Sequence, residues 1–169
     1  MSLDFHSLKS AFKEHHTSEL TKVAHIIFVP SFVFFLFIVL EFIPNFPIKQ
    51  LKNSAFNFSQ LTALILSFLY IYTTPKQGVV TSLWVIAFNF LARHVFSIFE
   101  DKRSLFIVSF VVSLSSLLLQ FGSHYVGEPK MPEKVDRLAV PLAPLMITDL
   151  LMDRVGLGED GSTEGKRKN

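Results

Sequence analysis

The sequence contains no cysteine. The chain can therefore form no disulfide bond, offers no thiolate nucleophile and cannot ligate an iron–sulfur cluster through cysteine. Any transition metal would have to be held by histidine and carboxylate side chains. Charged residues are also sparse, at 18% of the chain with a formal net charge of +2, and the basic residues lie in short clusters between apolar runs. A basic surface for nucleic acid is not expected from this pattern.

Apolar residues dominate the chain instead. Half of the 169 residues are hydrophobic and 19 are phenylalanine, which exceeds the usual content of soluble domains and predicts a membrane protein. The first residues lack an apolar core, so we expect no cleavable signal peptide and expect the first span to direct insertion. Residues 2–14 alternate apolar and charged side chains near helical spacing, which predicts a short amphipathic helix on the membrane surface.

Four apolar runs predict an all-α membrane protein with four transmembrane helices, at about 23–43, 56–72, 79–99 and 105–121. Such runs reach about 26–32 Å at ~1.5 Å per residue, enough to cross a hydrocarbon core of ~30 Å. A further apolar piece, 138–152, contains Pro141, Pro144 and Asp149. We expect it to be a broken helix, re-entrant or interfacial, although a fifth span remains an alternative. Residues 1–155 then form a single helical domain and 156–169 a disordered tail.

The distribution of basic residues predicts the orientation. With four crossings, eleven lysines and arginines fall on the side of both termini and five on the other side. The excess favours both termini in the cytoplasm.

A histidine and a glutamate follow the fourth apolar run. His124 and Glu128 are four residues apart, so a helical extension of the run would put both on one face, with Cβ atoms roughly 5–6 Å apart. An imidazole and a carboxylate together suit a divalent transition metal. The commoner outcome for such a pair is solvation or a mutual hydrogen bond.

The number of crossings determines which histidines can meet. The first span begins, and the fourth ends, on the same membrane face, so His15, His16 and His25 can converge with His124. Adjacent helical residues point about 100° apart, so only one of the pair at 15 and 16 is expected to face such a site. His94 lies at the far end of the third span, roughly 30 Å away, and is excluded.

The residues around these histidines form a spaced pattern at both ends of the domain. The pattern comprises His16, His25, Val29, Pro30, Gln120, Phe121, His124, Glu128, Pro132 and Asp136. It resembles the small membrane proteins related to the fungal 2-hydroxy fatty acid dioxygenase of phytosphingosine breakdown. The nine-residue step to His25 fits that family from His16 and does not fit from His15. The resemblance covers about forty residues and leaves out the middle spans.

The resemblance implies an iron(II) dioxygenase of the endoplasmic reticulum membrane that shortens a 2-hydroxy fatty acid by one carbon with molecular oxygen. His16, His25 and His124 would hold Fe²⁺, with Glu128 as a fourth ligand or as the acceptor that fixes an imidazole. Glu128 and Asp136 are the candidate catalytic carboxylates, although Asp136 can equally cap the terminal helix. Three imidazoles and a carboxylate without thiolates suit a non-haem iron centre with open positions.

Two other classes of function fit the same residues. A zinc-dependent membrane hydrolase would use the same ligands, with Glu128 as general base. A non-catalytic scaffold or lipid-binding protein would need no metal.

Overall fold

The computed structural model describes residues 9–10, 12, 14, 16–43, 57–128 and 139–157. Over these residues the protein is all-helical and has no strand. The helices, in chain order, are α2 (Glu19–Glu41), α3 (Phe58–Thr73), α4 (Pro75–Ile98), α5 (Lys102–Gly127) and α6 (Ala139–Arg154). Of the predicted amphipathic helix 2–14, residues 9, 10, 12 and 14 are described and are helical. Residues 158–169 of the predicted tail lie outside the described part.

Three of these helices, α2, α4 and α5, are long and apolar enough to cross a membrane, whereas α3, with 16 residues, is shorter. Over the described residues, the prediction of an all-helical fold with long apolar helices that could span a membrane is confirmed. Helices α2 and α5 each begin after a residue whose side chain caps the helix, and both start earlier in the sequence than the predicted apolar runs. The Ser18 side chain accepts a hydrogen bond from the Leu20 N–H at the start of α2, and Asp101 caps α5 in the same way. Caps satisfy backbone donors that the apolar pattern does not reveal.

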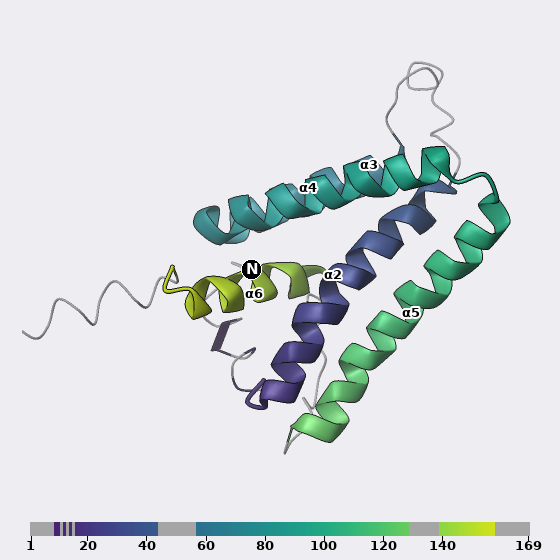
Figure 1. Ribbon diagram of the computed structural model, residues 1–169. Coiled ribbons are helices and arrows are strands. Elements are labelled where there is room, and N and C mark those ends of the chain that lie inside the picture. Colours follow the sequence, from purple (N-terminus) through teal and green to yellow (C-terminus); the bar gives the residue numbers. More distant parts are fainter. Residues whose placement is uncertain are drawn as a thin grey trace, which may run out of the picture.

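The helices form two layers that meet at one end and diverge at the other (Figure 1). In one layer α3 and α4 lie side by side, and in the other α2 packs along α5. At the closed end the ring of Phe42 contacts those of Phe96 and Phe106, with centroids 4.9 and 5.1 Å apart. The start of α2 and the end of α5 lie at the open end.

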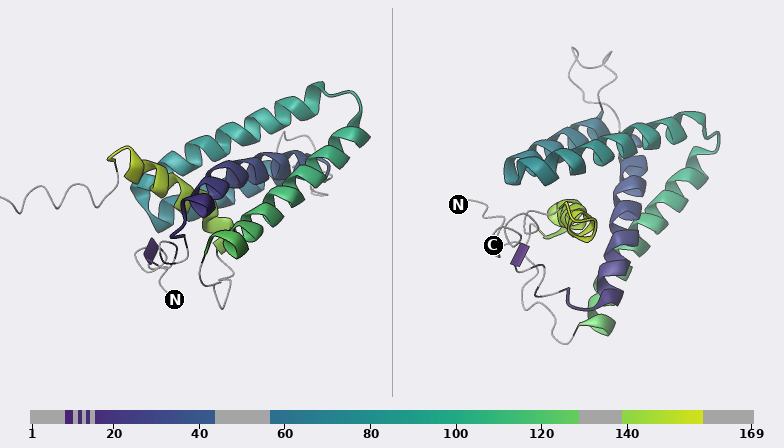
Figure 2. Two further views of the ribbon diagram at one scale, coloured as in Figure 1. Left: turned by 60° about the horizontal axis from the view of Figure 1, so that its bottom comes forward. Right: turned by 60° about the vertical axis from the view of Figure 1, so that its left-hand side comes forward.

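Helix α6 fills the space between the two layers (Figure 2). The predicted break at the prolines is wrong, because α6 is continuous with Pro144 inside it. Pro141 is in the first turn, where its missing N–H has no helical partner, and Pro144 removes a single hydrogen bond. Tertiary contacts support the helix, since the Tyr70 hydroxyl donates to the Pro141 carbonyl at 2.9 Å. Trp84 also donates, through Nε1, to the Thr148 hydroxyl at 3.0 Å.

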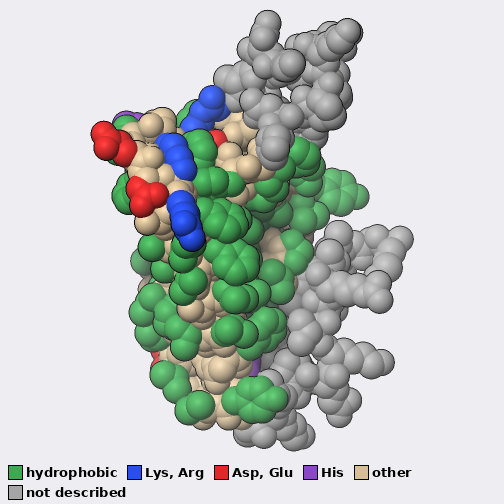
Figure 3. All heavy atoms as spheres, turned by 90° about the vertical axis from the view of Figure 1, so that its right-hand side faces the viewer, with side chains coloured by type: hydrophobic (Ala, Val, Ile, Leu, Met, Phe, Trp, Pro, Cys, Tyr) green, Lys and Arg blue, Asp and Glu red, His purple; other side chains and the backbone are tan. Residues whose placement is uncertain are grey.

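The two faces of α5 differ sharply. Its buried face carries small or polar side chains three and four residues apart, namely Ser109, Ser113, Ser116, Gln120 and Ser123. Small residues at this spacing let membrane helices approach closely, and α2 is the helix that packs along α5. The opposite face is apolar and exposed, and Figure 3 shows a continuous hydrophobic surface with charged side chains gathered at one end. That surface suits contact with lipid.

Candidate metal centre

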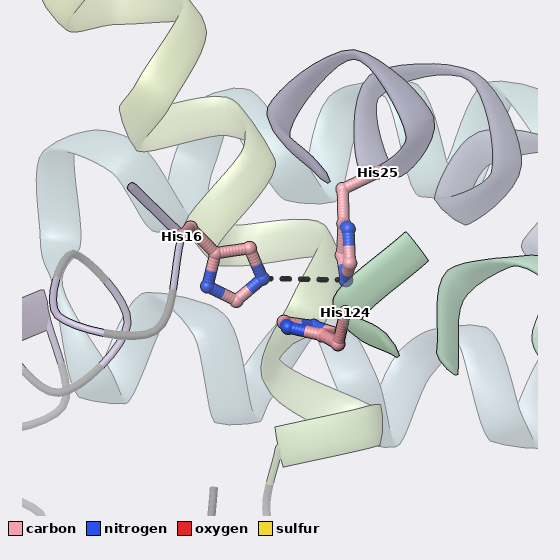
Figure 4. A group of neighbouring side chains, drawn as sticks. All are labelled: His16, His25 and His124. Carbon is pink, nitrogen blue, oxygen red and sulfur yellow. Dashed lines mark hydrogen bonds between the residues drawn. The ribbon is translucent and has the colours of Figure 1, made fainter. Parts of the chain in front are cut away.

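Three histidines from opposite ends of the chain meet at the open end of the two layers (Figure 4). His16 lies three residues before the start of α2, His25 lies on α2 and His124 lies near the end of α5. Their ring centroids are 4.5, 4.6 and 5.1 Å apart, and one ring nitrogen of each lies within 4.8 Å of the others. From the number of membrane crossings, these three histidines were expected on the same membrane face. The structure brings them together.

Hydrogen bonds orient two of the imidazoles toward each other. His16 Nδ1 lies 2.7 Å from the carbonyl oxygen of Phe12, and His25 Nδ1 lies 2.9 Å from that of Thr21. A carbonyl only accepts, so each Nδ1 carries the proton and each neutral ring has its lone pair on Nε2. The two Nε2 atoms are 3.3 Å apart. Two lone pairs facing at this distance repel unless a cation or a shared proton lies between them.

The spacing of the two nitrogens also suits a shared metal ion. Nitrogen ligands at ~2.0–2.1 Å from a tetrahedral ion are separated by about 3.3–3.4 Å. The observed separation of 3.3 Å falls at that value. The third imidazole, that of His124, stands edge-on to both rings. A set of three neutral nitrogen donors therefore fits a divalent transition metal such as iron or zinc.

Burial keeps the imidazole of His16 in the neutral form that a metal requires. The side chains of His16, His25 and His124 are only 8%, 6% and 8% exposed. For His16, which lies outside the spans, burial first and the neighbouring His25 second lower the pKa to about 3. The ring of Phe12 stacks on that of His16 with centroids 3.7 Å apart and limits its rotation.

Glu128 does not join the group of three. The last helical residue of α5 is Gly127, and Glu128 has extended backbone angles (φ −110, ψ 139), so its side chain leaves the face that carries His124. One carboxylate oxygen accepts hydrogen bonds from the Thr17 N–H at 3.1 Å and the Thr17 hydroxyl at 2.6 Å, and the other accepts from the Ser18 N–H at 3.1 Å. The carboxylate thus caps the positive end of α2. It ties the end of α5 to the start of α2.

These hydrogen bonds set the ionisation of Glu128. Partial burial would raise its pKa, but the hydrogen bonds from Thr17 and Ser18 outweigh it and lower the pKa to about 2. The residue is an anion at neutral pH. Its charge favours a cation at the nearby imidazoles, because it raises the proton affinity of His16.

A glycine allows α5 and α2 to approach at this end. A Cβ atom on Gly127 would lie 2.4 Å from the Thr21 hydroxyl oxygen and 3.2 Å from that of Ser18. The Thr21 hydroxyl donates to the carbonyl of Ser123 at 3.3 Å. Sequence reasoning missed the roles of Thr21 and Gly127 in this contact. No local pattern indicates them, since their partners are more than 100 residues away.

Asp136 and His15 are outside the described residues. His94 is exposed on α4 and does not belong to the group.

No protein-family model matches the sequence, and no match is found among curated proteins or among solved structures.

Proposed function

We propose that this protein is a non-haem iron(II) dioxygenase that shortens 2-hydroxy fatty acids by one carbon. The observation that carries the proposal is the pair of Nε2 atoms of His16 and His25, 3.3 Å apart with both Nδ1 atoms bonded to carbonyls, beside the imidazole of His124. This arrangement offers three neutral nitrogen ligands from one side. The resemblance in sequence around the same histidines supplies the choice of iron and of substrate.

Three protein ligands would leave coordination positions free for other molecules. Bound iron(II) would supply activation of dioxygen and a charge for the carboxylate and 2-hydroxyl of the substrate. Glu128 orders the first turn of α2 and so sets the relative positions of His16 and His25. Lys22 shares the lining of a small hollow with His16 and pairs with Glu19 at 2.9 Å, and its charge would help to attract the carboxylate of a substrate that approaches this end of the protein.

The proposed reaction balances without an external reductant. One 2-hydroxy acid and one dioxygen yield the acid shortened by one carbon, carbon dioxide and water. The bond between C1 and C2 breaks, C2 is oxidised from alcohol to carboxylate level, and dioxygen is reduced. The exposed apolar side chains near the end of α5, which include Leu118, Leu119 and Val126, would let the acyl chain approach from the lipid.

We further propose that the membrane arrangement has four crossings, with α3 as the shortest span. At ~1.5 Å per residue its 16 residues reach about 24 Å, which local thinning of the bilayer can accommodate. The excess of basic residues favours both termini, and with them the three histidines, on the cytoplasmic face of the endoplasmic reticulum.

The zinc-hydrolase alternative is less well supported by the site. Glu128 was the obvious general base, and both of its oxygens are engaged by Thr17 and Ser18. A base must reach the attacking water. A scaffold with no metal would leave the two buried Nε2 atoms, 3.3 Å apart, with only a shared proton to relieve their repulsion.

The decisive experiment is a turnover assay with 2-hydroxypalmitate. Iron-loaded protein purified in detergent should convert it to pentadecanoic acid only when dioxygen is present. His25→Ala and His124→Ala should abolish conversion. Full conversion by both variants, or none by the iron-loaded wild type, would refute the proposal.

A further inference from the structure

A buried ion pair lies close to the metal centre and belongs to neither of its helices. Lys9 Nζ is 3.1 and 3.2 Å from the two carboxylate oxygens of Asp149 on α6, and 3.5 Å from Asp153. Lys9 is 7% exposed and Asp149 is 3% exposed. Gln77 on α4 also donates to Asp149, at 3.3 Å. Ion pairs buried to this extent are costly to desolvate, so their position in a membrane protein calls for an explanation.

Lys9 belongs to the same short stretch as His16. The described residues of this stretch, Lys9, Ser10, Phe12, Glu14 and His16, are called the N-terminal segment below. Lys9 and Phe12 are helical and three residues apart, which places them on one helical face, and His16 follows Phe12 by four residues and is itself not helical. Phe12 stacks on the His16 ring, and its carbonyl lies 2.7 Å from His16 Nδ1. Whatever fixes Lys9 and Phe12 therefore also fixes the imidazole.

Phe12 of the N-terminal segment packs against the hydrophobic core, and a small hollow remains between the segment and α6. A hollow of about 30 Å³, roughly the space of one water molecule, lies between them and is lined by Lys9, Phe12, His16, Met146 and Asp149, among others. The other two ligands, His25 and His124, come from long helices that pack along their lengths. His16 is the ligand carried by a short segment, which Lys9 holds through an ion pair and Phe12 through packing against the core.

We infer that the Lys9–Asp149 ion pair is a positioning pair that docks the N-terminal segment on α6 and so holds His16 at the metal centre. This inference rests on the metal centre proposed above. When the segment is undocked, two imidazoles remain and affinity falls. When it is docked, three are present. By linkage, metal binding and docking stabilise each other.

The expected size of the effect follows from the docked fraction. Apparent affinity falls in proportion to the fraction of molecules in the competent state. If loss of the ion pair lowers that fraction to about 1–10%, metal binds roughly 10–100-fold more weakly, as is usual for residues that orient a ligand. Lys9→Met is the direct variant, because it removes the charge and keeps an unbranched apolar side chain.

The test is a titration of full-length protein in detergent with Co²⁺. Lys9→Met and Asp149→Asn should each weaken binding about 10–100-fold. In a His16→Ala background, Lys9→Met should cause no further loss beyond about twofold, because the pair acts through His16. The matched control is Arg154→Met, which removes an exposed cation of α6 that pairs with Glu19, and it should bind as wild type does. Wild-type affinity in Lys9→Met, equal loss in the control, or an undiminished effect of Lys9→Met without His16 would each overturn the inference.

A second measurement detects docking of the N-terminal segment on α6 in the absence of metal. The chain has no cysteine, so spin labels can be placed on cysteines introduced at Ser10 and Leu151, both exposed. The distance between the labels should be narrowly distributed in wild type and broad in Lys9→Met. A narrow distribution in both would overturn the inference whatever the metal content. Absence of metal from wild type, with the distribution still dependent on Lys9, would instead contradict the metal centre and retain the docking role.

Discussion

Replacing Gly127 by alanine should separate α2 from α5 at the end where their histidines meet. The added Cβ would lie 2.4 Å from the Thr21 hydroxyl oxygen, about 1 Å short of ordinary contact. The obstacle is a short β-branched side chain on a helix, so the helices must move apart or Thr21 must leave its rotamer. Overpacking of this kind costs about 1–3 kcal/mol.

Gly127→Ala should weaken metal binding as well as lower stability. Ligand distances at a metal tolerate deviations of only about 0.2 Å, whereas the clash demands a movement of about 1 Å close to His25 and His124. We expect metal affinity to fall by at least about tenfold, in line with the cost of ~1 Å misplacements at functional sites.

The assay is metal titration and thermal unfolding of Gly127→Ala beside Gly122→Ala. Gly122 lies on the same helix, and a Cβ there would meet nothing within 4 Å, so that variant should bind metal as wild type does and gain up to ~1 kcal/mol of helix stability. Adding Thr21→Ala to Gly127→Ala removes the clashing oxygen and should restore part of the affinity. Equal metal affinity in the two glycine variants would refute the reasoning.

Three further predictions concern Glu128, Gly78 and the histidines. Glu128→Gln removes part of the cap on α2 and should lower the free energy of unfolding by about 1–2 kcal/mol. Because the folded-state pKa of Glu128 is about 2, below its ordinary value of 4.5, its contribution is present above pH ~4.5 and is lost as pH falls toward 2. The difference in Tm between wild type and Glu128→Gln should therefore shrink over that range. A constant difference would contradict the role of the Glu128 carboxylate as a cap on α2. Gly78→Ala places a Cβ 2.2 Å from the Tyr70 carbonyl oxygen and should cost about 1–3 kcal/mol by thermal unfolding while leaving metal affinity unchanged; an unchanged Tm would show that α3 and α4 are not in close contact there. His25→Ala and His124→Ala should eliminate tight metal binding measured by elemental analysis, whereas His94→Ala, at an exposed position, should retain it.

The sequence predicted the helices and the meeting of the histidines better than it predicted local detail. Long apolar runs identify α2, α4 and α5 because the lipid interior leaves few alternatives to a helix. Counting crossings brought His16 and His25 to the same face as His124 without any knowledge of packing. Neither inference depends on side-chain geometry.

The errors came where tertiary contacts override a local rule. Glu128 was expected on the face of His124 because helical spacing puts residues four apart together, but α5 ends at Gly127 and Glu128 turns to the start of α2. Pro144 was expected to break the last apolar segment, but contacts of Tyr70 and Trp84 with α6 hold the helix together. In both cases the deciding partner is remote in sequence.

The most direct test of the central claim is the metal content and coordination of the protein extracted from its native membrane. X-ray absorption of the bound metal should show one ion per chain with imidazole nitrogens at ~2.0–2.2 Å, about three in wild type and about two in His16→Ala. Protein that carries no stoichiometric metal, or whose coordination is the same without His16, would contradict the claim that these three imidazoles share one ion.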